Sequence, residues 1–134
     1  MIRPTFAFFC WFSCSALAAC SGSASSLESA LNFPVQLAPG QAAVIKDENL
    51  EVQFVGISSD SRCPSDVTCV WAGEVVVQLA VRSDSKTTQH EVRESQGATI
   101  ANHTVTVLQV LPPRGSSQQT IARADYRVTL KVAR

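Results

Sequence analysis

The sequence has little of what metal centres and common enzyme classes require. It contains two histidines and a single methionine, which is the first residue. His90 and His103 lie far along the chain from the cysteines and in no ligand spacing. There is no Gly-x-Ser-x-Gly elbow, no His-Glu-x-x-His pair, no glycine-rich phosphate loop, and no carboxylate pair set apart by its context. We therefore expect no cofactor, no resident metal and no enzymatic activity.

The chain also lacks net charge. Eleven Lys and Arg residues balance eleven Asp and Glu residues. A protein that binds nucleic acid needs an excess of positive charge to neutralise phosphates, so nucleic acid is not an expected partner. The length of 134 residues leaves room for one domain, and 46% hydrophobic residues are typical of a globular chain.

The apolar run at the N-terminus is too short to cross a bilayer. It extends from about Phe6 to Leu17 after the basic Arg3, whereas a spanning helix requires roughly 20 apolar residues. A short basic start followed by a short apolar run is typical of a secretory signal peptide. The sequence therefore predicts an exported protein.

The four residues LAAC, Leu17 to Cys20, resemble the lipobox of bacterial lipoproteins. The resemblance implies a signal peptide over residues 1–19 and a lipid-bearing Cys20 that anchors the protein in a membrane. Because Ser21 rather than Asp follows that cysteine, it also implies the outer membrane, facing the periplasm. The alternatives are display on the cell surface, or a soluble secreted protein cut after Ala18.

The number of cysteines supports lipidation. Of five cysteines, Cys10 and Cys14 leave with the signal peptide, so three remain in the mature chain. Lipidation of Cys20 removes the odd thiol and leaves Cys63 and Cys69 as one pair. In an oxidising compartment, two cysteines six positions apart are expected to form a disulfide. The alternative is a zinc or copper site, which would need two further ligands.

Apolar and polar residues alternate with a period of two through the rest of the chain, and no stretch sustains a helical pattern. The alternation changes phase near Leu108, where we expect a bulge. The polar segment 86–93 suits an exposed sheet edge. The expected strands are 33–37, 41–46, 50–54, 74–82, 86–93, 104–111 and 126–132.

About seven short strands predict an all-β fold, a small antiparallel β-sandwich over residues 33–134. A small open β-barrel is the alternative. Residues 20–32 are rich in serine and small side chains, and we expect them to form a flexible tether behind the anchor.

The stretch around the cysteine pair contains the candidate binding residues Asp60, Arg62 and Asp66. We expect Arg62 and Asp66 to be exposed, because a cross-linked turn can present charged side chains at little entropic cost. The alternative is that Asp60 pairs with Arg62 or caps backbone amides. Trp71 should project to the same side as Cys69 and pack on the disulfide or the core. Its alternative is an exposed anchor for a partner.

Two motifs resemble a wider group of proteins. DSRCP, residues 60–64, followed by CVWAG, residues 69–73, is similar to a pattern in small bacterial exported proteins and lipoproteins of unassigned function. LAPGQ at 37–41 and DYRVTLKV at 125–132 are similar too, whereas Gly73 by itself indicates a bulge or a close backbone approach. The resemblance implies no activity.

We therefore expect a noncatalytic binding or accessory module of the cell envelope, whose partner is an envelope protein or a glycan. The alternative is a small periplasmic enzyme or metal-handling protein. That alternative requires a pocket in which His90 or His103 meets carboxylates or thiols.

Overall fold

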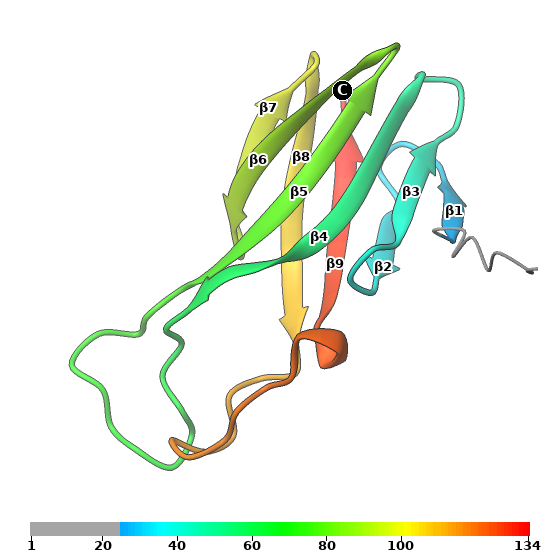
Figure 1. The fold of residues 1–134 in the computed structure, drawn as a ribbon. Coiled ribbons are helices and arrows are strands. Elements are labelled where there is room, and N and C mark those ends of the chain that lie inside the picture. Colours follow the sequence, from blue (N-terminus) through cyan, green and yellow to red (C-terminus); the bar gives the residue numbers. More distant parts are fainter. Residues whose placement is uncertain (1–24) are drawn as a thin grey trace, which may run out of the picture.

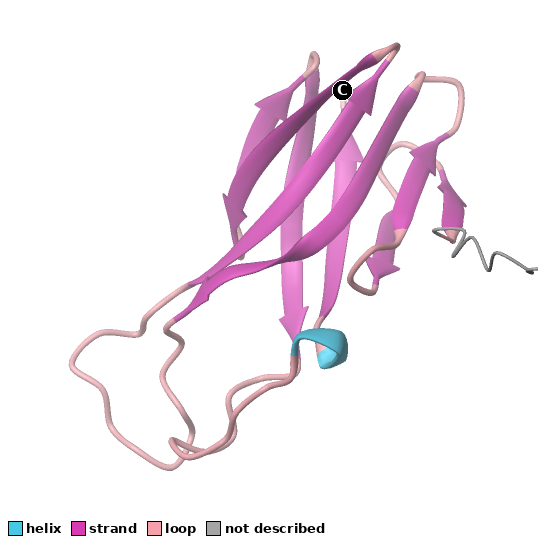
Figure 2. Cartoon of the chain, in the orientation of Figure 1, coloured by secondary structure: helices cyan, strands magenta, loops and turns pink. Residues whose placement is uncertain are grey.

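The computed structural model describes residues 25–134, which form two facing β-sheets (Figure 1). All pairings are antiparallel except that of β1 with β3. One 3₁₀ turn, η1 (Arg123–Asp125), is the only helical element of the described residues (Figure 2). The five-stranded sheet has the order β1 (Ser26–Ser29), β3 (Ala42–Ile45), β4 (Leu50–Asp60), β5 (Val75–Ser83), β6 (Lys86–Arg93), and the four-stranded sheet has the order β2 (Pro34–Leu37), β9 (Arg127–Ala133), β8 (His103–Leu111), β7 (Gly97–Ile100).

The predicted β-sandwich is thus confirmed, with nine strands rather than about seven. Its core lies between the inner faces of the two sheets, as in other aligned sandwiches. In β9, Val128, Leu130 and Val132 are buried, while the residues between them are partly exposed. Phe54 of β4 is the largest side chain that is fully buried. The period-two alternation therefore correctly marks the inner face.

Two further expectations about the strands are confirmed. Val107 pairs with Leu130 and Gln109 pairs with Thr129, so Leu108 is the extra residue of a bulge in β8. The polar β6 forms one edge of the five-stranded sheet. The sequence shows both features because a bulge shifts the alternation of apolar residues by one position, and because an edge strand tolerates polar residues on both faces.

The ordered sheet begins earlier than the expected boundary at residue 33. Strand β1 lies within the segment expected to be a tether, and Ser26 to Ser29 pair in parallel with Ala42 to Ile45. The expected signal peptide and Cys20 lie outside the described residues. Within residues 25–134, no helix has the length and apolar character needed to cross a membrane.

Strands β4 and β5 run beyond the sandwich and are joined by residues 61–74, here called the clasp loop. Residues 112–122, here called the companion loop, connect β8 to η1 and lie beside the clasp loop (Figure 1). The two loops project from one end of the sandwich, and the C-terminus lies at the other end (Figure 1). This projecting end is the clasp end.

Candidate functional site

A disulfide closes the clasp loop. Cys63 and Cys69 are bonded to each other, with their Cα atoms 5.9 Å apart, which confirms the predicted pair. The backbone N–H of Cys63 donates to the carbonyl of Ala72 at 3.0 Å, so hydrogen bonding between the two arms continues past the strands. Both sulfurs are consumed by the bond, and the described residues contain no group of three metal-ligating side chains.

Gly73 lets the two arms of the clasp loop come close together. It has a φ of +70°, and a Cβ at this position would lie 1.8 Å from the carbonyl oxygen of Ser61. The N–H of Ser61 donates to the carbonyl of Glu74 at 2.8 Å, and the N–H of Glu74 donates to the Ser61 hydroxyl at 3.0 Å. The expected close backbone approach is confirmed, because only glycine fits here.

Asp60 and Arg62 form an ion pair that ties the base of the clasp loop to β8. The guanidinium of Arg62 donates from Nε to Oδ1 of Asp60 at 2.8 Å and from Nη2 to Oδ2 at 2.6 Å. It also donates to the carbonyls of Val110 at 2.9 Å and Pro112 at 3.0 Å. The Tyr126 hydroxyl donates to Oδ2 of Asp60 at 2.9 Å. The side chains of Arg62 and Asp60 are only 14% and 8% exposed.

The electrostatics of this network favour its charged form. Burial alone would raise the pKa of Asp60, but hydrogen bonds from Arg62 and Tyr126 and the positive charge of Arg62 outweigh it, so the pKa is lowered. The hydrogen bonds to Asp60 raise the pKa of Arg62. Burial, and then the adjacent carboxylate, raise the pKa of Tyr126, which therefore stays a neutral donor.

The prediction that Arg62 is exposed is therefore wrong, and the alternative that Asp60 pairs with Arg62 is confirmed. The physical reason is that the end of β8 and the first residue of the companion loop each present a carbonyl beside the clasp base, and a partly buried guanidinium can satisfy both and the carboxylate together. Asp60 ends β4 and Arg62 follows two positions later, a spacing at which side chains of an extended chain project to the same side, and this spacing was the available sequence signal. Both side chains brace the loop from within.

Asp66 joins the clasp loop to the companion loop. Its carboxylate accepts hydrogen bonds from the backbone N–H and hydroxyl of Ser117, at 2.8 and 3.1 Å, and from the hydroxyl of Ser116 at 3.2 Å. Desolvation would raise the pKa of Asp66, but these hydrogen bonds together lower it. The residue is exposed, as expected. The backbone N–H of Ser65 adds a bond to the carbonyl of Arg114 at 3.1 Å.

Residues 67–72 of the clasp loop are largely apolar and exposed to solvent. Trp71 is 83% exposed and Val70 is 92% exposed, and Val67 is exposed as well. These three residues are here called the clasp tip. The prediction that Trp71 packs on the disulfide or the core is wrong. The clasp loop extends beyond the ends of both sheets (Figure 1), so the core between the sheets ends before it.

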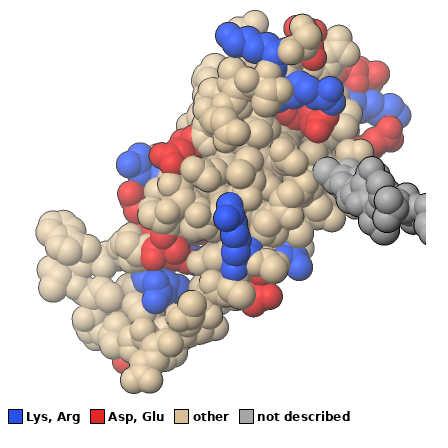
Figure 3. All heavy atoms as spheres, viewed as in Figure 1, with Lys and Arg blue, Asp and Glu red and all other residues tan. Residues whose placement is uncertain are grey.

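The clasp tip is also free of charge. Residues 67–72 read Val-Thr-Cys-Val-Trp-Ala and contain no ionisable side chain other than the disulfide-bonded cysteine. In Figure 3 the projecting end carries almost no Lys, Arg, Asp or Glu surface on the visible face, whereas charges cluster at its base. Exposed apolar groups that a fold holds rigidly in water are a common sign of an interaction site.

The two histidines occupy separate places. His103 is buried, with Nδ1 2.7 Å from the Ala101 carbonyl oxygen and Nε2 2.8 Å from Oε2 of Glu48. Arg134 also donates to Oε2 of Glu48, at 2.8 Å. The hydrogen bond from His103 lowers the pKa of Glu48, and the charge of Arg134 adds to the effect. His103 thus meets a carboxylate, as the enzyme alternative requires, but both of its ring nitrogens are engaged within the fold.

His90 lies on the edge strand β6, as expected, with Nε2 2.8 Å from the Thr88 hydroxyl. It borders an open hollow of about 460 Å³ between β6 and the β7–β8 turn. No cysteine, Asp or Glu except Asp84 shares this hollow. The structure therefore does not bring the two histidines together with thiols.

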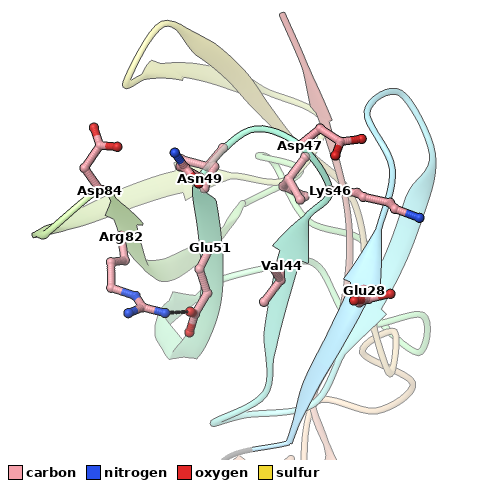
Figure 4. Close-up of a pocket in the computed structure, with 10 residues that line it drawn as sticks. Glu28, Val44, Lys46, Asp47, Asn49, Glu51, Arg82 and Asp84 are labelled. Carbon is pink, nitrogen blue, oxygen red and sulfur yellow. Dashed lines mark hydrogen bonds and ion pairs between the residues drawn. The ribbon is translucent and has the colours of Figure 1, made fainter.

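A larger hollow of about 600 Å³ lies on the outer side of the five-stranded sheet (Figure 4). Side chains of both signs line it, among them Glu28, Lys46, Asp47 and the ion pair of Glu51 with Arg82 (Figure 4). It contains no aromatic side chain and no histidine. It offers charged side chains of both signs and no exposed aromatic residue, so the clasp loop is the stronger candidate site.

The clasp loop is thus covalently closed, has an apolar tip, and is braced by a partly buried ion pair and by the companion loop. Its chemistry suits noncovalent contact, because the exposed tip bears no acid, base or nucleophile. Comparisons of the chain with protein-family models, curated proteins and solved structures found no match.

Proposed function

We propose that the protein is a noncatalytic binding module of the bacterial cell envelope, anchored by lipid on Cys20 and making contact with another envelope component through the clasp tip. The LAAC sequence, the apolar run before it and the parity of the cysteines support the anchor. The outer membrane, with the domain facing the periplasm, is the proposed location because Ser21 follows Cys20.

The observation that carries this proposal is the exposure of Trp71 on a loop that cannot easily rearrange. Large aromatic side chains supply much of the energy of binding interfaces. Here the indole is 83% exposed, on a loop closed by a disulfide and held at its base by Arg62. A preorganised loop loses little conformational entropy when it binds, so more of the burial energy becomes affinity.

A photocrosslinking amino acid at position 71 tests the proposal in intact cells. The matched control carries the same amino acid at position 33, because Phe33 is also an exposed aromatic residue, at 66%, in a different part of the structure. We expect adducts from position 71 to an envelope component, and few or none from position 33. Equal labelling from both positions, or none from either, would contradict the proposal.

A further inference from the structure

We infer that the clasp tip inserts into the interface of the bilayer that holds the Cys20 lipid, so that the protein contacts one membrane at two points. This inference rests on the proposed lipid anchor and names the counterpart of the clasp tip. Three features of the chain lead to it: the direction of β1, the length of the segment before it, and the chemistry of the tip.

The chain enters the sandwich from the clasp end. Strand β1 runs parallel to β3, and β3 runs antiparallel to β4, which leads to the clasp loop. Ser26 pairs with Ala42, and Ala42 pairs with Gln53. Residues before Ser26 therefore join β1 at the end that faces the clasp, while the C-terminus lies at the opposite end (Figure 1).

The tether is shorter than the distance by which the clasp loop projects beyond β1. Six residue steps separate Cys20 from Ser26, and a fully extended chain covers at most about 20 Å over that distance. On β4, seven steps separate Gln53 from Asp60, which corresponds to roughly 23 Å of strand. The clasp tip lies beyond Asp60. Because Cys20 would lie at the bilayer, Ser26 stays within about 20 Å of it, so the tip reaches the interface when the clasp end faces the bilayer and the long strands are tilted toward its plane.

The chemistry of the tip fits a lipid interface. Val67, Val70 and Trp71 are exposed, and no charge occurs from residue 67 to residue 72. The nearest charges along the chain are Asp66 and Glu74, and both are paired elsewhere, because the Asp66 carboxylate is bonded to the companion loop and Glu74 forms an ion pair with Arg93 at 2.7 Å. Tryptophan is enriched at membrane interfaces. A few apolar side chains bind a bilayer weakly alone, but they add to the membrane affinity of a protein that a lipid chain already holds there.

A weak insertion is sufficient in this arrangement. A tether of a few residues gives the tip a high effective concentration at the bilayer surface, so the second contact is an intramolecular event. The disulfide and the Asp60–Arg62 pair keep the tip projecting, so little ordering cost opposes insertion. The second contact would fix the orientation of the domain relative to the membrane.

Tryptophan fluorescence tests the inference directly. The chain has two tryptophans, and Trp11 leaves with the proposed signal peptide, so Trp71 is the only one in the mature protein. The lipidated full-length product would be reconstituted in phosphatidylcholine vesicles with and without brominated acyl chains. We expect Trp71 emission to shift to shorter wavelength in plain vesicles and to lose much of its intensity in brominated ones.

A matched control moves the single tryptophan to the other end of the molecule. In the double variant Trp71→Phe with Phe33→Trp, the indole replaces another exposed aromatic residue. Asn32 donates its N–H to the carbonyl of Val132, near the C-terminus, so position 33 lies away from the clasp. We expect no quenching for this variant. Val70→Asp should reduce the quenching of Trp71 while the circular dichroism spectrum stays unchanged.

The outcomes separate this inference from the proposed function. Emission of Trp71 that brominated lipid leaves unchanged, or equal quenching at positions 71 and 33, would overturn membrane insertion. If position 71 then still crosslinks to an envelope protein or glycan, the proposed binding function stands with a different counterpart. If position 71 gives neither quenching nor crosslinks, both proposals fail.

Discussion

Replacing Arg62 with alanine should destabilise the fold much more than replacing Trp71, although the tryptophan is the larger side chain. Arg62→Ala removes two hydrogen bonds to Asp60 and one each to the carbonyls of Val110 and Pro112. It leaves the Asp60 carboxylate, 8% exposed, with the Tyr126 hydroxyl as its remaining side-chain donor. An uncompensated charge at the clasp base is the main cost.

The expected magnitudes differ by several fold. Removing one partner of a buried ion pair costs about 3–5 kcal/mol, and because solvent reaches part of this pair we expect about 2–3 kcal/mol for Arg62→Ala. Trp71 is 83% exposed, so Trp71→Ala should stay within about 0.5 kcal/mol of the parent. Arg82→Ala is the matched control, because Arg82 also pairs with a carboxylate but is 58% exposed. It should cost at most about 1 kcal/mol.

Urea unfolding of the purified mature protein, followed by far-ultraviolet circular dichroism, measures these differences through the transition midpoint. Adding Asp60→Asn to Arg62→Ala should recover part of the loss, because the substitution removes the unpaired charge. The reasoning would be refuted if Trp71→Ala lowered stability more than Arg62→Ala, or if Arg62→Ala and Arg82→Ala had equal effects.

Three further outcomes are expected. Gly73→Ala should prevent the clasp loop from closing and lower the melting temperature sharply. The control Gly40→Ala is also at positive φ, but no atom lies within 4 Å of its new Cβ, so it should cost about 1 kcal/mol. Similar melting curves for the two variants would contradict this expectation. The pKa of Asp60 is lowered from its ordinary value of 3.8, so its stabilisation should be complete above about pH 4 and lost as the pH falls through the folded-state pKa; unfolding measured across this range should show a smaller decline for Asp60→Asn. Cys20→Ala should accumulate as precursor or leave the membrane fraction, Cys10→Ala should be processed normally, and normal membrane retention of Cys20→Ala would sink the proposed anchor.

Most of the sandwich could be predicted because the signal is local. Alternation in β9 places Val128, Leu130 and Val132 in the core, and the phase change at Leu108 marks a real bulge. Two short strands were missed for physical reasons. Strand β7 has only four residues, which is too short for a clear alternation. Strand β1 has no apolar alternation, and its backbone pairing with β3 holds it in the sheet instead.

The site was less accessible to prediction. The disulfide follows from an exported address and a short spacing, and both can be read from the sequence. The spacing of Trp71 from Cys69 gives the side of the chain on which the indole projects, but not whether a core lies there. The carbonyls of Val110 and Pro112 that bind Arg62 are 48 and 50 positions away, so only the fold brings these groups together.

The parallel pairing of β1 with β3 determines how the domain would bear mechanical load. If Cys20 is anchored, a pull on the domain enters through Ser26, and a pull directed away from the clasp end acts along the axis of β1. The four pairs from Ser26–Ala42 to Ser29–Ile45 would then be loaded in shear, all at once. A terminal strand pulled across its neighbour would instead open one hydrogen bond at a time, at much lower force. The short first strand can therefore carry the force between the anchor and the sandwich, so that the pairs of the core strands are not the first to break.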